Sequence, residues 1–212
     1  ILHFCKMKNI KSIIFDLGAV LLNIDYQKTI YEFEKIGIEK SSKFYSKEKQ
    51  NNIFNLLETG KISDEDFVKE IQLLCKDATG EQVIFSWNAL LLDLPKERIE
   101  LLKKLKQDFH IYILSNTNSI HISEFRKNLG EIKYQEFYNL FDKVYYSHEI
   151  GFRKPNKKSF QLILDDNNLK ANEVLFIDDS PQHIEGANKL GIQTHHLLDT
   201  EEITTLFPDI IR

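Results

Sequence analysis

The chain has 212 residues, of which 42% are hydrophobic and 28% charged, and its formal net charge is −4. This is the composition of a globular chain with room for one substantial domain, or for a core with a smaller insertion. The sequence pI of about 6.0 and mean hydropathy of −0.34 exclude the basic footprint of a nucleic-acid-binding protein and give no sign of a membrane span. Cys5 and Cys75 have neither a disulfide framework nor zinc-site spacing. We therefore expect a cytoplasmic protein.

The first element of the chain is a short apolar run. Met7 is the only methionine, so we expect residues 1–6 to be non-native or upstream of the natural start. The apolar residues before Met7 are too few for a signal peptide. Residues 13–15 (IIF) then predict a buried strand that ends abruptly at Asp16, and Gly18 follows two positions later.

Residues 26–93 have helical periodicity with no convincing strand. Ser63 and Asp66 form a capping-box pattern at the start of one of these helices. The expected helices are 26–37, 42–58, 63–75 and 80–92. They predict either a helical elaboration on a sheet or a separate helical bundle inserted after the first strand.

From residue 96 onward, short apolar strands alternate with helical segments. The expected strands are 110–116, 143–148, 173–179 and 192–197. The expected helices are 96–108, 119–129, 156–167 and 181–190. This alternation predicts an α/β fold with a Rossmann-like parallel sheet covered on both faces.

Polar residues follow the expected strands at the edge where open parallel sheets bind ligands. They are Asp16, Ser115, Asn116, Lys154, Asp178 and Asp179. A single aspartate after a strand is often only a turn or cap residue. The adjacent pair Asp178–Asp179 is more informative, because two neighbouring carboxylates repel each other unless a cation lies between them.

Four segments together carry a family resemblance. They are FDLGAV, YILSNTN, RKPN and VLFIDDSPQHIEGA, in this order along the chain. They resemble the four motifs of the haloacid dehalogenase superfamily, which consists mostly of phosphohydrolases, and the resemblance spans residues 10–196. It is closest to the phosphatase branch whose first motif reads Asp-x-Gly, which includes small sugar-phosphate phosphatases. It implies a Rossmann-like catalytic core of residues 8–22 and 94–212 and a helical cap of residues 23–93.

The resemblance also implies a nucleophile and a metal. Asp16 would attack phosphorus and form an aspartyl-phosphate. Asp16, the backbone carbonyl of Gly18 and Asp179 would bind Mg²⁺, with Asp178 in a supporting position. All of these are hard oxygen ligands, which suit this ion.

Three further residues would bind the phosphate. The Ser115 hydroxyl and the Asn116 backbone N–H would donate to phosphate oxygens. Lys154 would neutralise charge on both the nucleophile and the phosphoryl group.

Gly18 is the departure from the pattern. Most phosphatases of the superfamily have a second aspartate here, which protonates the leaving oxygen and later activates water. We expect the glycine to permit a tight turn. Asp25, in the loop that enters the cap, and His183, just after the aspartate pair, are the nearest substitutes for the acid/base. Each can equally be an ordinary loop or helix residue.

The resulting prediction is a Mg²⁺-dependent phosphoric monoester hydrolase that acts on a small phosphorylated metabolite such as a sugar phosphate. One alternative is a catalytically impaired family member that binds phosphate or a protein partner, which Gly18 favours. Another is a 2-haloacid dehalogenase, which needs no metal and is disfavoured by Asp178–Asp179. We expect no nucleic-acid or membrane partner, and the sequence indicates neither the substrate nor the oligomeric state.

Overall fold

The sheet lies at the centre of the computed structural model, which describes residues 9–38, 52–75 and 77–208. Five parallel strands pair in the order β3-β2-β1-β4-β5. They are β1 Ser12–Phe15, β2 His110–Ser115, β3 Lys143–Tyr146, β4 Val174–Asp178 and β5 Gln193–His196. The expected α/β parallel-sheet fold is confirmed, while the expectation for residues 1–6 lies outside the described residues. Because β1 pairs with both β2 and β4, the chain order reverses at β1, which is where such sheets bind ligands.

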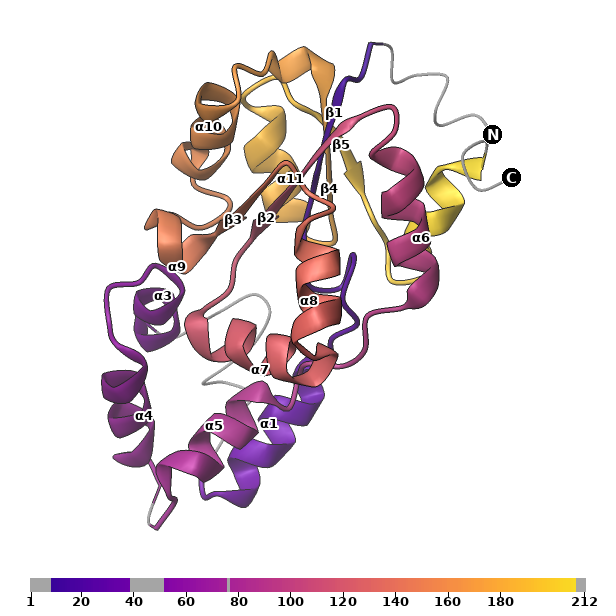
Figure 1. The fold of residues 1–212 in the computed structure, drawn as a ribbon. Helices are drawn as coiled ribbons and strands as arrows, with labels where there is room; N and C mark the ends of the chain where they lie inside the picture. The colour runs from indigo at the N-terminus through magenta and orange to yellow at the C-terminus, as the bar shows by residue number, and fades with distance from the viewer. Residues whose placement is uncertain (1–8, 39–51, 76, 209–212) are drawn as a thin grey trace.

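Helices cover both faces of the sheet (Figure 1). On one face lie α6 Lys96–Leu105, α7 Ser119–Leu129 and α8 Glu131–Tyr138, and on the other α10 Lys157–Asp166 and α11 Pro181–Asn188. Successive β1 side chains alternate between the two apolar clusters, since Ile13 and Phe15 join the first and Ile14 the second. The described residues of this part also form 3-10 turns at Ala171–Glu173 and Ile203–Leu206.

Within the described residues, four helices gather beyond the carboxyl ends of the strands, in the lower part of Figure 1. They are α1 Tyr26–Lys35, α3 Asn52–Glu58, α4 Asp64–Gln72 and α5 Gly80–Asn88. We call these four helices the helical insert. Their own apolar cluster surrounds Trp87, whose ring lies 4.9 Å from that of Phe54 and 5.6 Å from that of Phe67. The helix expected at 42–58 is described only from Asn52 onward.

The two connections between the helical insert and the rest of the chain are hydrogen-bonded to each other. The Asn23 N–H donates to the Asp93 carbonyl (2.9 Å), and the Leu92 N–H donates to the Asn23 carbonyl (3.0 Å). The Asp25 N–H donates to the Leu90 carbonyl (2.9 Å) in the same ribbon. The chain therefore leaves and re-enters the sheet region through one antiparallel pair of segments.

The structure differs from the expected elements between β2 and α10. Helix α8 was not expected from the sequence, and the strand expected at 143–148 ends at Tyr146, where the short helix α9 Ser147–Ile150 begins. Ser147 ends the strand because its hydroxyl donates to the Thr117 carbonyl (3.0 Å) and accepts from the Thr117 N–H (3.0 Å). This exchange ties α9 to the loop after β2.

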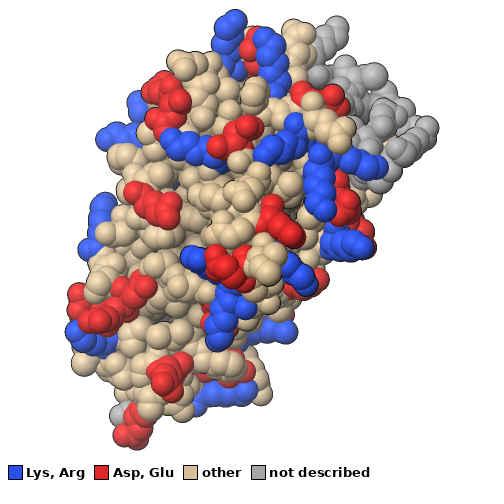
Figure 2. Space-filling model, viewed as in Figure 1, with Lys and Arg blue, Asp and Glu red and all other residues tan. Residues whose placement is uncertain are grey.

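The surface carries both signs of charge. On the face in Figure 2, acidic and basic side chains are interspersed, in keeping with the small net charge of −4. Within the described ranges, no helix combines the length and apolar character needed to cross a membrane.

Candidate active site

The carboxyl ends of the three central strands meet at one cavity. Asp16 directly follows β1, and the register pairs Phe15 with both Ile113 and Ile177. The ends of β2 and β4 therefore lie on either side of Asp16. A cavity of about 170 Å³ opens there. The expected site residues that line it are Asp16, Gly18, Ser115, Asn116, Lys154, Asp179 and His183.

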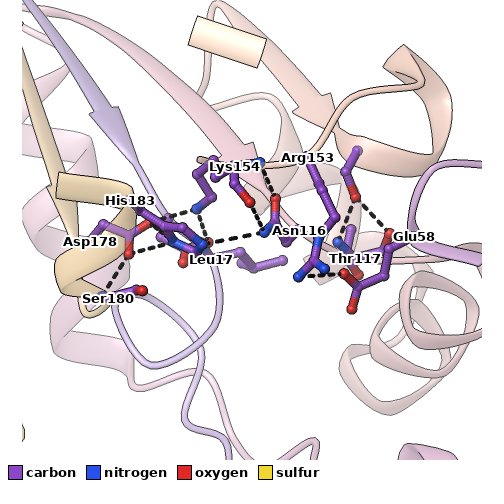
Figure 3. A network of polar contacts seen from close by, with 11 residues as sticks. Leu17, Glu58, Asn116, Thr117, Arg153, Lys154, Asp178, Ser180 and His183 are labelled. Carbon is purple, nitrogen blue, oxygen red and sulfur yellow. Dashed lines mark hydrogen bonds and ion pairs between the residues drawn. The ribbon is translucent and has the colours of Figure 1, made fainter. Parts of the chain in front are cut away.

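Lys154 lies at the centre of the polar network (Figure 3). Its side chain is fully buried, with Nζ 2.6 Å from Asp178 Oδ2 and 2.9 Å from Asp16 Oδ1. Burial opposes the ammonium charge, but the attraction of the two carboxylates is stronger and raises the pKa of Lys154 above its ordinary value. The lysine thus stays charged and holds the ends of β1 and β4 together.

The Asp16 carboxyl group accepts a hydrogen bond from the Leu17 N–H (2.7 Å) in addition to its contact with Lys154. Burial raises the pKa of Asp16 to about 7, opposed by Lys154 and reinforced by the charges of Asp178 and Asp179. Two carboxyl groups, those of Asp16 and Asp178, contact the one buried ammonium group, and the charge of Asp179 acts on Asp16 as well. A divalent cation would offset the excess negative charge and favour the carboxylate form of Asp16.

The two adjacent aspartates differ in their surroundings. Asp178 is completely buried, accepts from the Ser180 N–H (2.8 Å), and lies 2.9 Å from Nδ1 of His183. Burial raises the pKa of Asp178, although Lys154 opposes this shift. Asp179 lines the cavity, whereas Asp178 does not. Asp16, Gly18 and Asp179 line the cavity, and carboxylate and carbonyl oxygens suit a hard cation such as Mg²⁺. Asp16, Asp178 and His183 each offer one possible ligand atom, and these atoms lie within 4.8 Å of one another.

The loop that carries Lys154 is held from two sides. The Asn116 side chain accepts from the Lys154 N–H (2.8 Å) and donates to the Lys154 carbonyl (3.0 Å). On the other side, α11 approaches so closely that a Cβ at Gly186 would lie 2.9 Å from the Pro155 carbonyl oxygen. Asn116 and Gly186 thus position the loop on which the lysine depends.

The structure bears on one part of the expectation that Gly18 permits a tight turn, namely its backbone conformation. Gly18 does not have a positive φ, and the left-handed position of this turn is occupied by Ala19, at φ 60°. The conformational freedom of glycine is therefore not required at position 18. A Cβ there would lie 3.1 Å from Cδ1 of Ile24, so among the described residues the space is limited by a flexible side chain.

The two suggested substitutes for the acid/base occupy different places. The Asp25 carboxylate caps α1 by accepting from the Gln27 N–H (2.9 Å), and Asp25 does not line the cavity. His183 does line it, and its Nε2 lies 3.4 Å from Nδ2 of Asn116. Because that amide nitrogen is a donor, Nε2 accepts and the Nδ1–H faces Asp178. Burial, helped by Lys154, lowers the pKa of His183 to about 3, so the ring is neutral.

Among the cavity-lining residues that the sequence analysis did not single out are Tyr26, Glu58, His121 and Arg153. His121, on α7, stacks on Trp87 of the helical insert at 4.5 Å between ring centroids, and its Nδ1 lies 2.8 Å from Oδ1 of Asn88. Burial lowers the pKa of His121 to about 3. Only Arg153 had a signal in the sequence, because it precedes Lys154 in the RKPN segment.

A parallel sheet with aspartates at the ends of β1 and β4 and a buried lysine between them defines a hydrolase of the Rossmann-like class. The pattern of the haloacid dehalogenase-like hydrolases matches residues 10–191, and the chain belongs to this family. The expected family membership is thus confirmed.

Similar proteins support the phosphatase branch. The chain is 30% identical to D-ribitol-5-phosphate phosphatase of Bacteroides thetaiotaomicron, over 87% of this chain and 90% of that protein. A haloacid dehalogenase-family enzyme of the same organism, crystallised with magnesium and inorganic phosphate, has a TM-score of 0.86 at 32% identity, covering 93% of this chain and 98% of that one. A predicted hydrolase of the family from Porphyromonas gingivalis has a TM-score of 0.83 at 29% identity, covering 96% and 98%.

Proposed function

We propose that this protein is a Mg²⁺-dependent phosphatase that acts on phosphate monoesters of small sugars or polyols. The observation that carries the proposal is the placement of Asp16 beside the buried Lys154, with Asp179 lining the same cavity. Similarity to D-ribitol-5-phosphate phosphatase and to an enzyme crystallised with magnesium and phosphate supports both the metal and the substrate class. We place the reaction in the cytoplasm.

In the proposed reaction, the Asp16 carboxylate attacks phosphorus and the ester oxygen departs with its bonding electrons, which leaves an aspartyl-phosphate on Asp16. Water then attacks this phosphorus and releases inorganic phosphate and the free carboxylate. Lys154 balances negative charge through both steps, and the Ser115 hydroxyl and the Asn116 backbone N–H bind phosphate oxygens.

Bound Mg²⁺ would supply positive charge next to the phosphoryl group and reduce its repulsion by Asp16. In this proposal, the ion is held by Asp16, the Gly18 carbonyl and Asp179. Asp178 contributes indirectly, because its contacts with Lys154 and His183 orient the residues around the cavity. The helical insert belongs to a cap of residues 23–93 that covers the core and excludes water during transfer.

The proposal is tested by replacing Asp16 with asparagine. Asp16→Asn keeps the shape of the side chain but removes the anionic nucleophile, so hydrolysis of p-nitrophenyl phosphate should be lost while thermal unfolding stays cooperative. Chelation of Mg²⁺ by EDTA should abolish the activity of the unmodified protein. Asp108→Asn, an exposed residue before β2, is the matched control and should remain active. Turnover that survives either EDTA or Asp16→Asn would contradict the proposed function.

Gly18 favours a second candidate, a family member that binds phosphate without turnover. In that case, calorimetric titration with inorganic phosphate and Mg²⁺ would show binding, while no ester of an extended panel would be hydrolysed. Steady release of phosphate from any small ester, dependent on Asp16, would eliminate this candidate.

A further inference from the structure

A second pair of charged residues lies in the same cavity, away from the aspartates. Glu58 is the last residue of α3 in the helical insert, and Arg153 precedes Lys154 in the loop after α9. Arg153 Nη2 lies 3.0 Å from Glu58 Oε2, and the two side chains are only 26% and 6% exposed. Figure 3 shows this pair at one end of the polar network and Asp178 with His183 at the other.

The backbone of the helical insert fixes Glu58 at this place. Gly60, two residues further on, has φ +64°, and a Cβ there would lie 2.3 Å from the His148 carbonyl oxygen. The turn between α3 and α4 therefore rests directly on α9, whose end leads into Arg153. No Cβ fits at position 60, so the backbone there stays against His148, and the Glu58 carboxylate and the Arg153 guanidinium group meet beside the cavity.

The chemistry of this pair suits hydroxyl groups. A carboxylate offers only acceptor sites and a guanidinium group offers only donors, whereas each hydroxyl can both donate and accept. The Glu58 carboxylate also compensates the charge of Arg153. An alcohol that carries an anionic group of its own would therefore gain no net attraction from the pair, and the buried Glu58 carboxylate would repel it. The pair thus favours a neutral, polyhydroxylated leaving group.

We propose that Glu58 and Arg153 determine substrate specificity by binding hydroxyl groups of the alcohol that is released, and that Glu58 excludes alcohols that carry a carboxylate. This inference rests on the proposed phosphatase function and specifies its substrate class. The aspartates and Lys154 bind the phosphoryl end of the ester, and the Glu58–Arg153 pair binds the opposite end.

The test compares three esters: D-ribitol 5-phosphate, which is neutral beyond its phosphate, 2-phosphoglycolate, which carries a carboxylate, and p-nitrophenyl phosphate, which has no aliphatic hydroxyl. In Glu58→Gln, the kcat/KM for ribitol phosphate relative to p-nitrophenyl phosphate should fall about 10- to 100-fold, the loss expected for a hydrogen bond to a charged group. The change should be mainly in KM, because the contact is remote from phosphorus. The relative kcat/KM for phosphoglycolate should rise, because the charge of Arg153 is no longer compensated.

Two further variants separate specificity from folding. Glu58→Asp keeps the charge but withdraws the carboxylate, so it should lower the preference for ribitol phosphate without admitting phosphoglycolate. Glu70→Gln removes the same charge from an exposed position of α4 and should leave the ratios unchanged. If Glu58→Gln does not fold, Glu58→Asp and Arg153→Met still decide the question, since both should reduce the ribitol phosphate ratio.

The outcomes distinguish this inference from the function on which it rests. If the unmodified protein hydrolyses none of the three esters, the proposed phosphatase function fails. If it hydrolyses them and the Glu58 and Arg153 variants change all three equally, the function stands and the specificity role is overturned. A relative rise for phosphoglycolate in Glu58→Gln alone supports the exclusion of anionic alcohols.

Discussion

Replacing Gly18 with aspartate should restore a general acid to the active site. The backbone permits the change, because Gly18 does not have a positive φ and Ala19 occupies the left-handed position. The new Cβ would meet Cδ1 of Ile24 at 3.1 Å, a few tenths of an ångström closer than an ordinary contact. Ile24 is only partly buried, so its side chain can move and the cost should stay at the low end of the usual 1–3 kcal/mol for overpacking.

The increase in kcat/KM that Gly18→Asp produces should depend on the leaving group. Without an acid, alkyl phosphates with basic leaving groups should react about 10²–10⁴-fold more slowly than with one, which is the usual contribution of general acid catalysis. The nitrophenolate group departs without a proton, so the rate of hydrolysis of nitrophenyl esters should be little affected by the missing acid. Gly18→Asp should therefore flatten a steep dependence of kcat/KM on leaving-group pKa, and it should shorten the lifetime of any trapped aspartyl-phosphate.

The assay is a series of phosphate esters of graded leaving-group pKa. Gly18→Asn is the matched control, because asparagine has nearly the same size and the same contact with Ile24 but no acidic proton to transfer. Adding Ile24→Val removes the Cδ1 contact and separates steric from chemical effects. If kcat/KM depended equally steeply on leaving-group pKa in Gly18→Asp and Gly18→Asn, the reasoning would be refuted. A flat slope in the unmodified protein that steepens only in His183→Ala or Asp25→Asn would show that a substitute acid already acts.

Four further substitutions test the surroundings of the site. Asp179→Asn should weaken Mg²⁺ affinity more than Asp178→Asn, as measured by titrating activity with Mg²⁺. Asp178→Asn should instead lower the free energy of unfolding by about 3–5 kcal/mol, because the buried Lys154 ammonium group loses a charged partner. The pKa of His121 is lowered to about 3 in the folded protein, so only the unfolded chain binds this proton as the pH falls below about 6.5. Between pH 7 and pH 5, the free energy of unfolding should therefore fall by about 2 kcal/mol more in the unmodified protein than in His121→Gln. Urea denaturation at the two pH values measures this difference. An equal loss in both would contradict this sign. Gly186→Ala should cost about 1–3 kcal/mol in thermal or urea unfolding through its clash with Pro155, and an unchanged midpoint would show that the loop yields freely.

The gathering of polar residues at one edge of the sheet could be predicted, because their placement follows from local pattern and topology. Asp16 directly follows an apolar strand, and Ser115 and Asp178 each end one. Parallel strands present their carboxyl ends at one edge of the sheet. The helical insert was also visible, since its apolar periodicity excludes strands.

The opposite end of the cavity could not be predicted, because its contacts join segments far apart in the chain. Glu58 is the last residue of an ordinary helix. The close approach of Gly60 to His148 places the Glu58 side chain opposite Arg153. Likewise, the short helix α9 depends on hydrogen bonds between Ser147 and the loop after β2, which no periodicity within residues 143–150 reveals.

The paired connections at Asn23 and Asp93 affect how such a chain can diversify. The two connecting segments are hydrogen-bonded to each other, so the insert is a long loop between β1 and α6 whose two ends lie side by side. The entropy of closing that loop changes only slowly with its length, so an insert of different size can be spliced between the same two residues without separating β1 from α6. These positions are natural crossover points for chimaeras. Exchange there would replace Glu58, and with it the selection of the alcohol, while the aspartates and Lys154 stay in register.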